Sequence, residues 1–189
     1  MPTLTSDPVD VMLAHDAWAT RTLLSTCAKL THEQFHHPFD LGLKTLHLTM
    51  THIISVMRRW SDRIAERPLR PMLDAVPGAP SAIGAEARQR TVEELLALLD
   101  EAERDAREVI AGVRKQGFDT LLRLEFPDET GRKKRHTFAK GTALVHLCTH
   151  SMHHRAQAIA MLRMLGAAPI PDTDPIAWQE VTELPAEIV

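Results

Sequence analysis

The sequence predicts an all-α protein, a four-helix bundle with one long crossover and a small β-hairpin before the last helix. Apolar residues make up 44% of the 189 residues but aromatic residues only 4%, so the core is built from aliphatic side chains, which favour packed helices. Apolar residues recur at helical spacing in four long segments, and proline or glycine separates these segments. Four such helices can pack as a bundle, a fold that places metal sites between facing helices.

The first two helices are marked by their ends. Ser6-Asp7-Pro8 offers a polar cap and then a proline that the first helical position tolerates, and this helix is expected to run to about Lys29. The second helix is expected over about residues 42–66, where apolar residues lie at helical spacing and Pro68 follows the end. The next segment, 68–85, is rich in proline, glycine and alanine and forms the long crossover.

The other two helices are expected on either side of a hairpin. Thr91-Val-Glu-Glu94 is a capping box that opens the third helix, which ends at Gly117. Residues 121–126 alternate between apolar and polar, a turn signal follows at 127–131, and a second strand fits residues 134–138. The fourth helix is expected over about residues 141–165.

The whole chain, residues 1–189, is expected to form one domain, because this length is enough for one well-buried core. Residues from about 167 to 189 carry five proline or tryptophan residues without a clear period. They are expected to form a C-terminal tail that follows the surface or reaches a neighbouring molecule.

Charge and hydropathy exclude several classes of partner. The formal net charge is −3, so no general attraction for nucleic acid is expected, and the basic run at residues 132–135 fits a solvated turn. No apolar run reaches the roughly 18 to 20 residues that span a bilayer, and the first residues lack the pattern of a signal peptide. A soluble, cytoplasmic protein without a membrane partner is the expectation. Cys27 and Cys148 are too few for a disulfide framework.

The fourth helix carries a stripe of histidines that points to a metal site. His146, His150 and His154 are spaced four apart and share one helical face. Imidazole is the commonest metal ligand, and two histidines at i and i+4 can bind one ion without distorting the backbone. The alternative is that these are exposed or hydrogen-bonded histidines with no ion. Cys148 is two residues from both neighbours, so it points to another side of the helix.

A further ligand has to come from elsewhere, and the second helix offers two candidates. His47 lies on an apolar stripe, where a buried neutral histidine with one hydrogen-bond partner is the ordinary outcome. His52 lies on a mixed stripe that suits the lip of a polar pocket. Periodicity does not decide between them. Of the remaining histidines, only His15 is placed where it could face the bundle axis.

The chain resembles a known family, the DinB-like metal-binding four-helix bundles, which are related to the bacillithiol- and mycothiol-dependent S-transferases. The motifs are Leu46-His-Leu-Thr-Met-Thr-His52-Ile-Ile-Ser-Val-Met-Arg-Arg-Trp60 and His150-Ser-Met-His-His154-Arg-Ala-Gln157. In that family a histidine of the second helix, eight positions before a tryptophan, joins two histidines four apart in the last helix. The resemblance therefore implies a metal site made by His52, His150 and His154.

The resemblance also implies a function and partners. It implies a divalent metal ion, with zinc and nickel as the leading candidates, a small-molecule substrate, a low-molecular-weight thiol and a homodimer. The usual His-Arg-Gly-Gln of the family appears here with Ala156 in place of glycine. His146 extends the stripe by one turn, where it would compete as a ligand or line the pocket, and Trp60 and Trp18 are candidates for an apolar pocket wall.

Two functional hypotheses follow from three neutral imidazoles, which leave an ion with its full charge and with open positions. The first is a metal-dependent thiol S-transferase or isomerase acting on a small electrophile. The second is a non-catalytic metal-binding bundle with a structural or protein-interaction role. A metallopeptidase fits less well, because Ser151 stands where a His-Glu-x-x-His enzyme has its general base.

Overall fold

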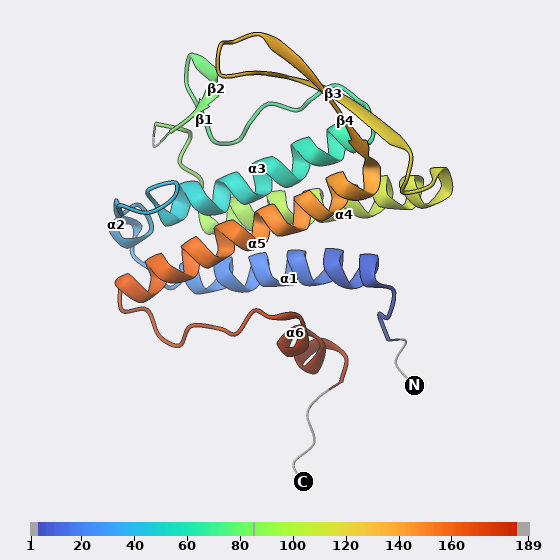
Figure 1. Cartoon of the computed structure of the whole chain (residues 1–189). Coiled ribbons are helices and arrows are strands. Elements are labelled where there is room, and N and C mark those ends of the chain that lie inside the picture. The colour runs from blue at the N-terminus through green and yellow to red at the C-terminus, as the bar shows by residue number, and fades with distance from the viewer. Residues whose placement is uncertain (1–3, 85, 185–189) are drawn as a thin grey trace.

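Four long helices lie side by side along most of their length in the computed structural model, which describes residues 4–84 and 86–184 (Figure 1). These helices are α1 (Pro8–Cys27), α3 (Leu46–Ile64), α4 (Val92–Gln116) and α5 (Lys140–Met164). Two short helices, α2 (His32–Phe35) and α6 (Pro175–Thr182), complete the helical part. The prediction of a mainly helical protein is therefore confirmed.

The helices begin where the sequence provides a cap. The Asp7 carboxylate accepts hydrogen bonds from two backbone N–H groups at the start of α1, with Pro8 at the first helical position. Thr91 and Glu94 form the predicted capping box of α4. The second long helix, however, begins at Leu46 and not near residue 42, because Gly42 and Lys44 both have positive φ angles and Thr45 provides the cap.

The long connection between α3 and α4 decides the directions of the helices. It carries the chain back to the end at which α3 began, so α3 and α4 run one way while α1 and α5 run the other (Figure 1). Helix α3 packs on both α5 and α4, and α1 packs on the opposite sides of the same two helices. The residues of α3 and α5 that face each other therefore run antiparallel, which brings the middle of α3 to the middle of α5.

The hydrophobic core between the four helices consists mainly of aliphatic side chains, as the composition predicted. Every long helix contributes to this core, and its largest fully buried members include Leu23, Leu24, Leu46, Met50, Ile53, Leu95, Leu99, Leu147 and Met161. Burial of each such side chain contributes about 1.5–3 kcal/mol relative to exposure. The core occupies most of the facing surface of α3 and α5, and the polar cluster described below lies at its edge.

Two antiparallel hairpins lie on the same side of the helices (Figure 1). Strands β3 (Leu121–Pro127) and β4 (Lys133–Ala139) form the hairpin predicted before the last helix, with Leu121 opposite Ala139. Strands β1 (Ala75–Val76) and β2 (Ala79–Ile83) form a second hairpin inside the predicted crossover. The sequence does not signal this one, because the segment is rich in proline and shows no alternation.

The C-terminal tail contains a short helix, α6, which the sequence did not predict. Asp174 caps α6 by accepting a hydrogen bond from the N–H of Ala177, and Trp178 is buried where α6 meets α1. Residues 185–189 of the predicted tail lie outside the described residues. Within the described part of the chain, none of the helices combines the length and the apolar character needed to cross a membrane.

Candidate metal centre

Helices α3 and α5 bring three histidines together. One ring nitrogen from each of His52, His150 and His154 lies within 4.8 Å of the corresponding nitrogens of the other two. The ring centroid of His52 lies 5.1 Å from that of His150 and 4.8 Å from that of His154. Three nitrogens at these separations could hold one metal ion, with metal–nitrogen bonds of about 2.0–2.1 Å.

A buried carboxylate fixes the ring of His52. The Asp74 side chain is completely buried, and its Oδ2 lies 2.6 Å from Nδ1 of His52. An ionised carboxylate has no proton to give, so Nδ1 of His52 donates and the lone pair of Nε2 is left for another partner. Metal-binding histidines are commonly oriented by a carboxylate in this way.

The carboxylate itself is held in its ionised form. Burial alone would raise the pKa of Asp74, but the hydrogen bonds from His52 and from the Ser55 hydroxyl, 2.6 Å from Oδ1, outweigh that effect and lower the pKa. The Ser55 oxygen also accepts a hydrogen bond from the N–H of Leu73. These contacts attach the connection before β1 to the middle of α3.

A glutamine has the corresponding role at His154. The amide oxygen of Gln157 lies 2.9 Å from Nδ1 of His154, and its amide nitrogen lies 3.1 Å from Nε2 of His153. The amide oxygen can only accept, so Nδ1 of His154 donates and its Nε2 lone pair is free. Gly42 packs against this glutamine so closely that a Cβ at position 42 would collide with the amide.

His150 lacks such a partner. Its Nδ1 is buried and makes no hydrogen bond to any of the described residues. A buried polar nitrogen without a partner is costly, and a metal ion is one partner that would remove this cost. Burial, together with the neighbouring histidines, lowers the pKa of His150 to about 3, and burial likewise lowers the pKa of His154. Both rings are therefore neutral at pH 7, the form that binds metal.

The other candidate residues lie elsewhere. His47 is buried, and its Nε2 accepts a hydrogen bond of 2.9 Å from the N–H of Arg90, so it is the buried neutral histidine that its apolar stripe suggested. His15 does not face the bundle axis, since its Nε2 donates to the carbonyl oxygen of Thr173 at the surface of α1. His146 is exposed and lies edge-on to Trp60, at 4.7 Å between ring centroids.

A cavity of about 240 Å³ opens beside His52 and His150. Trp60, as expected, and Phe126 of β3 contribute to its walls, while Trp18 is not among the residues that line it. Two arginines of α3, Arg59 and Arg63, also line it. Their spacing of four on one helical face was visible in the sequence, but Asp74 carried no signal beyond being an acidic residue in an apolar connection.

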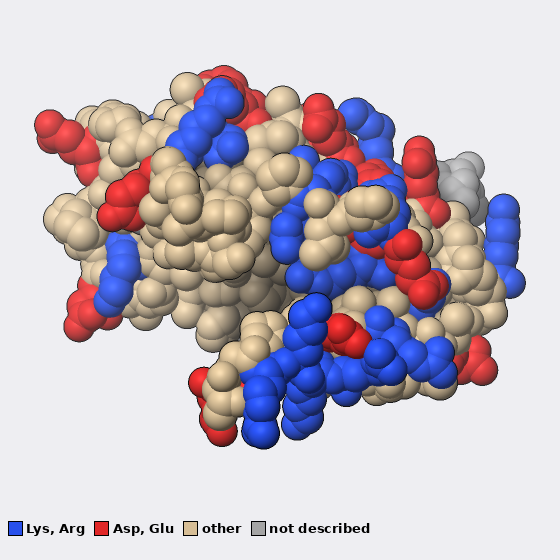
Figure 2. All heavy atoms as spheres, turned by 90° about the horizontal axis from the view of Figure 1, so that it is seen from above, with Lys and Arg blue, Asp and Glu red and all other residues tan. Residues whose placement is uncertain are grey.

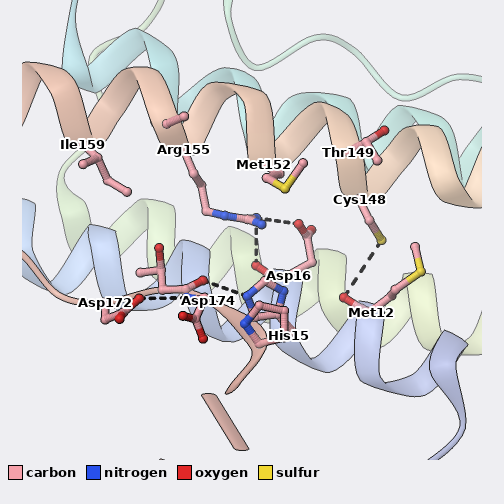
Figure 3. A pocket seen from close by; sticks show the side chains of 13 residues that line it. Met12, His15, Asp16, Cys148, Thr149, Met152, Arg155, Ile159, Asp172 and Asp174 are labelled. Atoms are coloured by element: carbon pink, nitrogen blue, oxygen red, sulfur yellow. Dashed lines mark hydrogen bonds and ion pairs between the residues drawn. The ribbon is translucent and has the colours of Figure 1, made fainter. Parts of the chain in front are cut away.

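A larger cavity of about 510 Å³ lies on another face of α5, against α1 and residues 172–175 (Figure 3). Cys148 lines this cavity and not the histidine cluster, as helical periodicity predicted, and burial raises the pKa of its thiol to about 12. Arg155 forms a buried ion pair of 2.5 Å with Asp16 here. Residues 154–157 therefore face both ways: His154 and Gln157 toward the cluster, Arg155 toward α1.

We expect the Asp74→Asn substitution to weaken metal binding by about 10- to 100-fold, the usual effect of removing a group that orients a metal-binding histidine. Asparagine keeps the size of the side chain but removes the charge that holds the proton on Nδ1 of His52. Zinc affinity by competition with a chromogenic chelator measures the change. Asp119→Asn, at an exposed site, is the control, and equal affinities in the two variants would contradict the role of Asp74.

Protonation of His47 should make the free energy of unfolding depend on pH, independently of the histidine cluster. Burial, aided by nearby positive charges, lowers the pKa of His47 to about 4 in the folded state, against about 6.5 in the unfolded chain. The unfolded state thus binds the proton first, and stability falls as the pH drops from 6.5 to 4, by up to about 3 kcal/mol. Urea unfolding of metal-free protein at pH 7 and pH 4.5 should show a smaller loss for His47→Gln than for the wild type. An identical loss in both would contradict this.

Comparison with known proteins agrees with the pattern of these residues. The sequence model of the DinB family matches residues 1–183 of the chain. A search of curated proteins finds none that matches significantly.

Proposed function

This chain belongs to the DinB family, and from that membership and the histidine cluster we propose that it binds one divalent metal ion through His52, His150 and His154. The observation that carries the proposal is the convergence of three imidazoles, two of them oriented by Asp74 and Gln157. Zinc and nickel are the leading candidates, because imidazole suits both and supply decides between such ions. The scaffold in this proposal is a four-helix bundle made by α1, α3, α4 and α5 in a single domain.

We further propose that the protein is a metal-dependent thiol S-transferase or isomerase that acts on a small electrophile. An ion held by three neutral imidazoles keeps its full positive charge and favours the thiolate form of a low-molecular-weight thiol, the nucleophile of such reactions. Among the described residues, no fourth histidine, cysteine or carboxylate joins the three histidines. The cavity beside His52 and His150 offers space for a substrate.

The residues around the cluster each have a definable role in this function. Asp74 and Gln157 hold two imidazoles in the tautomer that presents Nε2. Trp60 and Phe126 exclude water from one side of the cavity, which strengthens electrostatic interactions inside it. The homodimer that the resemblance implies stays a prediction.

Titration of small thiols into cobalt-substituted protein tests the function. Bacillithiol, mycothiol, glutathione or cysteine should produce a sulfur-to-cobalt charge-transfer absorption if a position on the ion is open to a thiolate. The Asp119→Asn variant, changed at an exposed residue that does not line the cavity, should give the same spectra. No spectral change with any of these thiols would favour the second hypothesis, a metal-binding bundle with a structural or protein-interaction role.

A further inference from the structure

The cavity beside the histidine cluster is basic as well as aromatic. Arg59 and Arg63 lie one helical turn apart on α3 and both line it, next to His52 and His150. Figure 2 shows that lysine and arginine gather on the face of the molecule that carries the hairpins. Arg67 and Arg70 are paired with acids, whereas Arg59 and Arg63, like Arg58, form no ion pair within the described residues. Of these three, only Arg59 and Arg63 line the cavity.

Arg63 is held in place by aromatic rings and not by an acid. Its guanidinium carbon lies 5.2 Å from the ring centroid of Trp60 and 5.7 Å from that of Phe126. No carboxylate of the described residues forms an ion pair with it. Burial and the neighbouring charge of Arg59 lower the pKa of Arg63, and the charge of Asp62 opposes them only in part.

Arg59 is equally short of negative partners. It donates one hydrogen bond, of 2.6 Å, to the carbonyl oxygen of Arg70, and forms no ion pair within the described chain. The acids that could serve it are already engaged: Asp62 pairs with Arg67 and Arg70, and Asp74 binds His52 and Ser55.

Two guanidinium groups of like charge on one helical face repel each other, and partial burial increases that repulsion. An oxyanion in the cavity would accept hydrogen bonds from both and remove the repulsion. Guanidinium groups match carboxylate and phosphate oxygens in geometry, often through two parallel hydrogen bonds.

We infer that the small molecule bound in this cavity carries an oxyanionic group, a carboxylate in the simplest case, which Arg63 and Arg59 bind while the rest of the molecule lies against Trp60 and Phe126. The inference rests on the proposed function, because it describes the substrate of the same site. The anionic group belongs either to the thiol or to the electrophile. Given a cavity of about 240 Å³, the ligand is small.

Binding of succinate by calorimetry tests the inference without any reaction. Zinc-loaded wild-type protein should bind succinate, and Arg63→Gln and Arg59→Gln should each weaken that binding by about 10- to 100-fold, the range expected for hydrogen bonds to a charged group. Circular dichroism and the unfolding temperature establish that each variant is folded. Two variants are used so that the result does not depend on the folding of one.

Arg58→Gln is the matched control. Arg58 precedes Arg59 on the same helix, and its substitution removes the same charge. Arg58 lines a different cavity, however, with Arg88, Arg90 and Glu94. Succinate binding should be nearly unchanged in this variant. An equal loss in Arg58→Gln and Arg63→Gln would overturn the inference, because the effect would then come from net charge alone. Absence of succinate binding by the wild type at millimolar concentration would overturn it as well.

A second titration locates the anionic group and separates this inference from the proposed function. In cobalt-substituted protein, 3-mercaptopropionate should bind at least about tenfold more tightly than the neutral 3-mercaptopropanol if the thiol carries the group, and Arg63→Gln should abolish the preference. Equal binding of the two thiols, together with Arg63-dependent succinate binding, assigns the group to the electrophile. If neither thiol gives a charge-transfer band while succinate binding still depends on Arg63, the thiol function fails and the anion site stands.

Discussion

Replacing His150 or His154 by alanine should abolish stoichiometric metal binding. Each substitution removes one of three nitrogens that meet within 4.8 Å and leaves two imidazoles, too few to retain a divalent ion against a chelator. The expected loss exceeds about 100-fold in affinity, because removal of an orienting partner alone costs about 10- to 100-fold. Elemental analysis after dialysis against a chelator, with circular dichroism as a check on helix content, measures it.

The control for this experiment is His136→Ala, which removes an exposed histidine of β4. It should keep one ion per chain. His146→Ala tests whether His146 competes as a ligand, because His146 lies one turn before His150 on the same face, with 5.6 Å between the ring centroids. Undiminished metal binding in both His150→Ala and His154→Ala would reject the three-histidine site.

The second large effect is expected at the buried ion pair between α1 and α5. Arg155 and Asp16 are 4% and 1% exposed, and Nη1 of Arg155 also donates to the hydroxyl of Thr20. Burial raises the pKa of the Asp16 carboxyl, and the charge of Arg155 opposes that rise. Arg155→Met leaves the carboxylate buried without its partner, which should reduce the free energy of unfolding by about 3–5 kcal/mol.

Urea unfolding of Arg155→Met measures this loss, and two further variants interpret it. The double variant Arg155→Met, Asp16→Leu should recover much of the stability, since apolar residues of similar size often replace a buried ion pair without cost. Arg107→Met breaks an exposed ion pair with Glu103 on α4 and should have a far smaller effect. If the single variant Arg155→Met were as stable as the wild type, the pair would not contribute to folding as described.

Much of the helical layout could be predicted from the sequence because its signals are local. The capping box of Thr91 and Glu94 and the proline after Asp7 mark helix starts through contacts within one turn. The hairpin before α5 follows from alternation over a few residues. The prediction failed at the start of α3, where residues 39–45 form a turn: Gly42 and Lys44 have positive φ angles, and the N–H of Lys44 donates to the carbonyl oxygen of Leu41.

The residues of the candidate site could likewise be predicted only where the signal was local. Helical periodicity alone placed His150 and His154 on one face, and separated Cys148 from them. It could not choose between His47 and His52, and the choice came from the resemblance to a family. In the structure, the N–H of Arg90, 43 residues away in sequence, donates a hydrogen bond to Nε2 of His47. The antiparallel packing of α3 on α5 brings His52 to the other two histidines.

The sequence by itself therefore determined the four long helices, most of their ends and the spacing of the histidine pair, all of which depend on contacts within a few residues. Only the tertiary structure decided that Asp74, 22 residues from His52 in an irregular connection, orients that ring. It also decided that Arg63 rests on Phe126 of β3 and that Gln157 packs against Gly42. These contacts join segments distant in the chain, and their positions depend on how the helices pack, which no local pattern encodes.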